Sequence, residues 1–147
     1  MKRQYIYTLL FLLAIPFASC EKLPINGRLD GMWKLQKMTD THMNTKHPEG
    51  IFYSIQLNLI KLSKINNSGT PEKTSELYLG RFQYTPDSLI LSDFHTWVYR
   101  EEEIPATPEQ LAPFGFTETD ARFGIEKLSK EEMILKSKDF LLIFEKF

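Results

Sequence analysis

The sequence predicts an all-β domain, a small antiparallel barrel or sandwich that carries one short helix. Apolar and polar residues alternate with a period of two along several segments, which is typical of half-buried strands. Turn-forming residues, mainly Pro, Gly, Asn and Asp, separate these segments at short intervals. The chain has 147 residues, enough for one domain with a hydrophobic core. Closing the sheet on itself would remove the exposed edges that so many strands create.

The first 19 residues have the parts of a secretory signal peptide. Lys2 and Arg3 give a positive start, and a nearly continuous apolar run occupies residues 5–17. This run is shorter than the about 20 apolar residues that a membrane-spanning helix needs. Ala18 and Ser19 are small residues of the kind that a signal peptidase accepts at its cleavage site.

Cys20 follows directly and is the only cysteine in the chain. The tetrapeptide at 17–20, Phe-Ala-Ser-Cys, resembles the bacterial lipobox, in which the cysteine sulfur receives a diacylglycerol before cleavage. We therefore expect a signal peptide over 1–19 and a mature protein that is lipid-anchored through Cys20 in the cell envelope, at the outer membrane. Whether it faces the periplasm or the cell surface stays open. The alternative, an ordinary signal peptide before a chance cysteine, leaves that cysteine without a disulfide partner.

Residues 20–29 contain Pro24, Asn26 and Gly27 and are predicted to be a tether, with the folded domain over 30–147. The chain carries 18 basic and 19 acidic residues, a formal net charge of −1. Because the sequence shows no basic stripe, a nucleic-acid partner is not expected.

Seven segments are predicted as strands. The segment 51–63 places Tyr53 and Ile55 on one face, and the alternation slips after Leu59, which indicates a bulge within one long strand. Pro and Asp in the segment 85–88 stand where a type I turn favours them. The predicted strands are 31–39, 51–63, 77–85, 88–99, 122–129, 132–137 and 140–146.

One short helix is predicted to begin after Thr107. The segment 107–110 has a capping residue, Pro at the first helical position, and Gln three residues after the cap. Leu111 and Phe114 supply an apolar side, and Gly115 is suited to end the helix.

A resemblance to a known family rests on both ends of the mature chain. The motif Gly-Met-Trp-Lys-Leu at 31–35 follows the predicted lipidation site, and the chain closes with Leu-Ile-Phe-Glu-Lys at 142–146. These segments, together with 111–116, resemble the lipocalin-like domain lipoproteins of Gram-negative anaerobic gut bacteria. The resemblance implies an up-and-down barrel with an internal cavity, in which Trp33 is a structural residue at the closed end. It implies no reaction.

No catalytic, cofactor or metal site is predicted, so we expect a non-enzymatic protein. His42 and His47 lie in a polar loop without the regular spacing of a metal motif. His95 is not accompanied by a nucleophile motif. The glutamates at 101–103 are adjacent, whereas paired catalytic carboxylates need two different environments.

Two functions remain open. The first is binding of a small apolar or sugar-like ligand inside the barrel. A barrel of about 8 strands holds one small ligand or is filled by its own side chains, and in the second case the same aromatics are core residues. The aromatic strand residues expected to line such a cavity are Tyr53, Tyr78, Phe82, Tyr84, Trp97 and Tyr99.

The second function is a protein–protein interaction module in an envelope complex. Its basis is the segment 97–116, a long connection with its own helix, several prolines and three consecutive glutamates. The simpler interpretation of this segment is a lid that plugs one end of the barrel. A sealed and filled barrel would favour the interaction module over an internal ligand.

Overall fold

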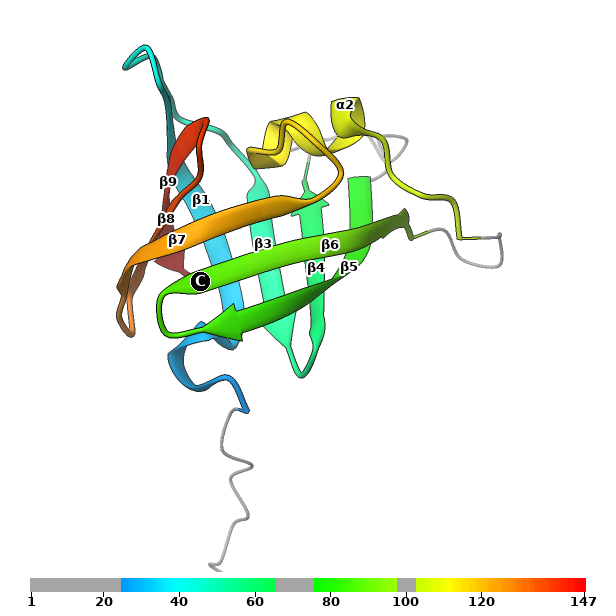
Figure 1. Cartoon of the computed structure of the whole chain (residues 1–147), viewed down its shortest axis with the longest axis horizontal. Coiled ribbons are helices and arrows are strands. Elements are labelled where there is room, and N and C mark those ends of the chain that lie inside the picture. Colours follow the sequence, from blue (N-terminus) through cyan, green and yellow to red (C-terminus); the bar gives the residue numbers. More distant parts are fainter. Residues whose placement is uncertain (1–24, 66–75, 98–102) are drawn as a thin grey trace, which may run out of the picture.

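The structure, a computed structural model, describes residues 25–65, 76–97 and 103–147. Within these ranges nine strands form one antiparallel sheet that closes into a barrel (Figure 1). Eight of them make the wall, because β1 (Gly31–Asp40) pairs with both β3 (Ile51–Gln56) and β9 (Phe140–Lys146). The other elements are η1 Gly27–Leu29, β2 Thr45–Lys46, β4 Leu59–Lys64, β5 Glu76–Thr85, β6 Ser88–Thr96, α2 Pro108–Leu111, η2 Ala112–Phe114, β7 Ala121–Leu128 and β8 Glu132–Lys136.

Consecutive wall strands are neighbours in the barrel, so the predicted up-and-down fold with one short helix is confirmed. Five of the seven predicted strands agree with the structure to within one residue at each end. The predicted strand 88–99 corresponds to β6, which ends at Thr96, and residues 98 and 99 lie outside the described ranges.

The prediction of one long strand over 51–63 is wrong. The segment forms two strands, β3 and β4, joined by a tight turn at Leu57 and Asn58, with Gln56 paired to Leu59. Leu57 has a φ of 59°, a left-handed conformation that leucine rarely adopts. Because this turn contains neither Gly nor Pro, the slip in alternation and Asn58 were its only sequence signals.

The base of the barrel, the end at which β1 begins, is closed around Trp33. The indole Nε1–H donates to the Leu29 carbonyl oxygen at 2.8 Å, and the Lys146 ammonium lies 4.1 Å from the ring centroid. Lys146 also donates to the carbonyl oxygens of Arg28 and Asp30, and its partial burial lowers its pKa. Leu29, which was expected in the tether, is fully buried, so η1 packs as part of the domain.

The inside of the barrel is filled with the protein's own side chains. Tyr53 packs on Phe144 with 4.7 Å between ring centroids, and Phe116 lies edge-on to Phe94 and Phe123 at 5.3 and 6.1 Å. Buried apolar residues from all eight wall strands form one continuous cluster. This cluster occupies the space in which the family resemblance implies a cavity.

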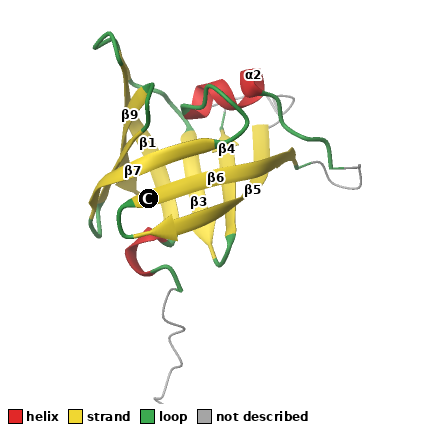
Figure 2. Ribbon diagram, in the orientation of Figure 1, coloured by secondary structure: helices red, strands yellow, loops and turns green. Residues whose placement is uncertain are grey.

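The opposite end, the mouth, is closed by α2, η2 and the two residues that follow, together named the plug (108–116). Figure 2 shows these helical turns in red, with η1 at the other end of the barrel. The predicted capping box is confirmed: the Gln110 N–H donates to Thr107 Oγ1 at 3.4 Å, and the Thr107 N–H donates to Gln110 Oε1 at 2.9 Å. Gly115 ends the plug's helical turns with a φ of 91°, as predicted.

Candidate functional site

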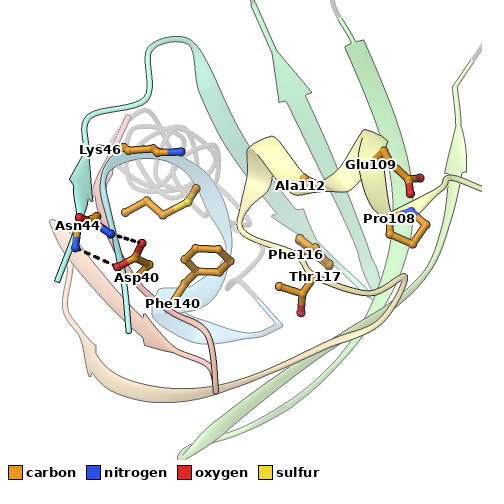
Figure 3. A pocket seen from close by; sticks show the side chains of 10 residues that line it. Asp40, Asn44, Lys46, Pro108, Glu109, Ala112, Phe116, Thr117 and Phe140 are labelled. Carbon is orange, nitrogen blue, oxygen red and sulfur yellow. Dashed lines mark hydrogen bonds between the residues drawn. The ribbon is translucent and has the colours of Figure 1, made fainter. Parts of the chain in front are cut away.

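A cleft of about 450 Å³ lies at the mouth, between the tip of the β1–β2 hairpin, the plug and the start of β9. We name it the mouth cleft. Figure 3 shows the hairpin residues Asp40, Asn44 and Lys46 on one side of it and the plug residues on the other. Its apolar lining consists of Met38, Pro108, Ala112, Phe116 and Phe140, and its polar lining of Asp40, Asn44, Lys46, Glu109 and Thr117.

The floor of the mouth cleft is continuous with the barrel core. Met38 and Phe116 are only 7% and 2% exposed, so the surrounding packing fixes their positions. Phe140 is half-buried and packs against the same core cluster. Closure of the barrel brings the floor together, because the pairing of β1 with β9 places Asp40 directly opposite Phe140.

The rim of the mouth cleft carries charges of both signs. The Asp40 carboxylate accepts hydrogen bonds from the Asn44 side-chain amide and from the backbone N–H groups of Asn44 and His42, each at 2.9 Å. These bonds, the one from the Asn44 side chain first, lower the pKa of Asp40. The pKa of Glu109 is also lowered, chiefly by a hydrogen bond from its own backbone N–H. Together with Lys46, the rim presents two carboxylates and one basic side chain.

Two of the predicted wall aromatics, Tyr53 and Tyr78, are core residues. The Tyr53 hydroxyl donates to the Phe114 carbonyl oxygen at 2.6 Å, and complete burial raises the Tyr53 pKa far above its ordinary value. Tyr78 lies edge-on to Phe114 at 5.7 Å, and burial raises its pKa as well. Both phenols therefore stay protonated, and Tyr53 connects the wall to the plug.

The other predicted wall aromatics are dispersed. Phe82 and Tyr84 are half-buried and pack against the core cluster from the second half of β5. The expectation that Trp97 faces the interior is wrong, because its side chain is 56% exposed on the outer surface just after β6. Tyr99 and the lipidation candidate Cys20 lie outside the described ranges. None of the described wall aromatics lines the mouth cleft.

Among the described residues, no group of three or more His, Asp or Glu side chains converges to hold a metal ion. His42 lies exposed in the loop of the β1–β2 hairpin, and His47 Nδ1 hydrogen-bonds to the Gln36 carbonyl oxygen at 3.2 Å. In the described ranges no helix is long and apolar enough to cross a membrane.

A barrel of this topology, filled inside and plugged by a short helix, defines a lipocalin-like class of fold. The chain belongs to the lipocalin-like domain family, whose pattern matches residues 12–147. A lipocalin-like protein from Bacteroides uniformis ATCC 8492 has a similar structure, with 19% identity and a TM-score of 0.62, over 82% of this chain and 100% of that one. An uncharacterized protein from Bacteroides eggerthii DSM 20697 is similar at 20% identity and a TM-score of 0.63, over 80% and 98%. No curated protein matches this sequence. At these identities the two structures support the fold alone.

Proposed function

We propose that this protein is a non-enzymatic, lipid-anchored protein of the cell envelope that binds a small ligand in the mouth cleft. The observation that carries the proposal is the contrast between a barrel filled by its own aromatics and an open cleft of about 450 Å³ at the mouth. The sequence suggests a ligand site inside the barrel, whereas the site we propose lies on the outside of the plug.

The lining of the mouth cleft favours a ligand with one apolar face and several hydrogen-bonding groups. Small-molecule sites combine a largely apolar surface with a few well-placed polar groups. Phe140, Phe116 and Met38 form the apolar surface, and the Asp40 carboxylate is held in place by its hydrogen bonds. A sugar ring or a short lipophile with a polar head has this character.

The proposed anchor lies at the other end of the molecule. The described chain begins at the base, beside η1, whereas the mouth cleft lies where β1 ends (Figure 1). A lipid on Cys20 therefore leaves the mouth cleft open to the surrounding solution. Each buried CH₂ of an acyl chain contributes about 0.8 kcal/mol of membrane affinity, so two or three chains anchor the protein durably.

Metabolic labelling with a fatty acid tests the anchor. The wild-type chain is expected to take up the label and to sediment with membranes, whereas the Cys20→Ser variant should do neither. Equal labelling of the variant would contradict the anchor without affecting the ligand proposal.

Octyl glucoside below its micelle concentration is a suitable ligand probe, because it joins a sugar ring to an apolar chain. The protein beginning at Glu21 keeps every strand described above and serves for the titration. Phe140→Ser and Lys46→Glu are expected to weaken binding roughly tenfold, since a lost apolar or charged contact contributes about 1.5 kcal/mol or more.

The matched control is Lys61→Glu, the same charge change at an exposed position on β4. It is expected to bind the probe as the wild type does. Binding that is insensitive to Phe140→Ser and Lys46→Glu would remove the mouth cleft as the ligand site.

A further inference from the structure

We propose that an exposed apolar strip on the outside of the barrel rests on the lipid bilayer. The strip consists of Leu57, Leu59, Leu79 and Trp97, and we name it the outer strip. Leu57, Leu59 and Trp97 are 55%, 37% and 56% exposed, and Leu79 is half-buried. The orientation rests on the lipid anchor proposed above, whereas the apolar surface itself does not.

The four residues lie on neighbouring segments: Leu59 is on β4 and Leu79 on β5, whereas Leu57 is in the β3–β4 turn and Trp97 follows β6. In the pairing of β4 with β5, Leu59 lies opposite Arg81 and Lys61 lies opposite Leu79, so Leu59 and Leu79 are diagonal neighbours. Two surface clefts have Leu59 and Leu79 in common: one extends to Leu57 and the other to Trp97. The outer strip is therefore continuous from the β3–β4 turn to the end of β6.

Leu57 violates two local rules at once. It occupies the first position of a two-residue hairpin turn with a φ of 59°, where Gly is the usual residue. It also exposes more than half of a large apolar side chain to solvent. Neither the geometry of the turn nor solubility favours leucine here, and such violations concentrate at functional positions. A bilayer in contact with the turn gives this side chain an apolar partner.

The chain enters the fold beside the outer strip. The Asn26 side-chain amide donates to the Leu57 carbonyl oxygen at 2.8 Å, which places the start of the described chain against the β3–β4 turn. A fully extended chain spans at most about 3.6 Å per residue, so the path from Cys20 to Ile25 reaches no more than about 18 Å. A lipid on Cys20 consequently keeps Leu57, at the base end of the outer strip, close to the membrane surface.

Not every exposed apolar side chain is held in this way. Met43, at the tip of the β1–β2 hairpin, is 80% exposed and also has a positive φ, of 65°. It lies beyond the far end of the ten-residue strand β1, about 30 Å from the base at the usual rise per residue. This distance exceeds the reach of the tether, so Met43 is a matched residue away from the membrane.

The chemistry of the outer strip suits a bilayer surface. Tryptophan is enriched at membrane–water interfaces, where its apolar ring and its N–H group are both satisfied. Lys61 and Arg81, opposite Leu79 and Leu59 in the pairing of β4 with β5, add basic groups next to the apolar side chains, and Arg81 forms an ion pair with Asp93. Basic groups close to a membrane are attracted to anionic lipid headgroups.

The test uses the mature chain beginning at Cys20. Its single thiol is coupled to a maleimide-bearing phospholipid in vesicles of phosphatidylethanolamine and phosphatidylglycerol. Chemical coupling makes the test independent of whether cells lipidate Cys20. The reference is the same protein coupled to a soluble maleimide.

Tryptophan fluorescence reports the contact. The chain has two tryptophans, of which Trp33 is fully buried and Trp97 is 56% exposed. On vesicles we expect the emission maximum to move to shorter wavelength and the acrylamide quenching of Trp97 to fall severalfold. Trp97→Phe should abolish both changes. Leu57→Gly removes the apolar side chain while relieving the turn, and it should abolish most of the change, whereas Met43→Gly should not.

Three results would overturn the proposal. If acrylamide quenches Trp97 equally in the vesicle-coupled and the soluble-coupled protein, Trp97 makes no contact with the bilayer. A Met43→Gly variant that loses as much protection as Leu57→Gly shows that the contact is not specific to the outer strip. If the protection of Trp97 from acrylamide rises with the density of protein on the vesicle, the partner of the outer strip is a second copy of the chain and not the lipid.

Discussion

Trp33 shows how one side chain holds three elements of the barrel together. Its position is in β1, its indole N–H satisfies the last carbonyl of η1, and its ring accepts the Lys146 ammonium from β9. An amphipathic ring can make both contacts while its body stays in the core. The resemblance of the Gly-x-Trp motif implies this structural role, and the packing at the base agrees with it.

Trp33→Ala is expected to destabilise the domain by about 3–5 kcal/mol, because it leaves a cavity in a close-packed core. The same change leaves the Leu29 carbonyl without its donor. Trp33→Phe keeps an aromatic ring and loses the hydrogen bond, so it should cost about 1 kcal/mol. Urea unfolding measures both variants. If Trp33→Ala unfolds at the wild-type urea concentration, the base is not held together by this residue.

The plug is the element whose placement changes the functional interpretation. Phe114 and Phe116 fill the mouth end of the barrel, and the Tyr53 hydroxyl binds the Phe114 carbonyl oxygen. The described part of the connection between β6 and β7 is thus a lid, the simpler of the two interpretations that its sequence allows. Its outer surface forms one side of the mouth cleft.

Thr107→Ala removes the capping box of α2 and is expected to destabilise the plug by about 1 kcal/mol. Amide hydrogen exchange should accelerate at Gln110 and Leu111 and remain slow in β1 and β9, since the wall is closed independently of the plug. Uniform acceleration through the wall would show instead that plug and wall unfold as one unit.

The β1–β2 hairpin supplies two of the charged side chains that line the mouth cleft, Asp40 and Lys46. The pKa of Asp40 is lowered in the folded protein, so the Asp40 carboxylate favours folding above the pKa it has in the unfolded chain. This contribution is lost as the pH falls through its lower, folded-state pKa. Asn44→Ala removes the first cause of the shift and should raise the Asp40 pKa toward that of an unperturbed aspartate. A carboxyl NMR titration measures it, and an unchanged pKa would mean that Asn44 does not stabilise the carboxylate.

For the whole molecule, local sequence patterns predicted where most strands lie but not whether the interior of the barrel is filled. Period-two alternation is a property of each segment, so strands such as 77–85 and 140–146 could be found without knowing their partners. The turn at Leu57 gave no comparable signal, because it uses a residue that turns rarely accept. Whether inward aromatics enclose a cavity depends on how rings from several strands and the plug fit together, which alternation does not encode.

The mouth cleft was missed for a related reason. Met38, Phe116 and Phe140 lie far apart in the sequence and belong to β1, the plug and the start of β9. Only closure of the barrel between its first and last strands brings them together. Alternation places Met38 and Phe140 near strand ends, but it does not show that these ends share one opening.

The membrane anchor is proposed at the base of the barrel, and the ligand site is proposed at its mouth. The base and the Leu57 end of the outer strip lie next to the proposed anchor, and the mouth cleft lies at the far end of β1. A protein held at its base can exchange ligand with the solution at its mouth. This division predicts that changes in the outer strip leave ligand binding intact, and that changes in the mouth cleft leave the bilayer contact intact.

Methionine-methyl NMR distinguishes a ligand bound at the mouth from a ligand bound inside the barrel. Met38 lines the mouth cleft, whereas Met133 is fully buried in the barrel. When methyl-labelled protein is titrated with octyl glucoside below its micelle concentration, we expect a saturable shift of the Met38 methyl signal and an unchanged Met133 signal. A saturable shift of the Met133 signal with an unchanged Met38 signal would show instead that the interior opens to hold the ligand and that the mouth cleft does not bind it.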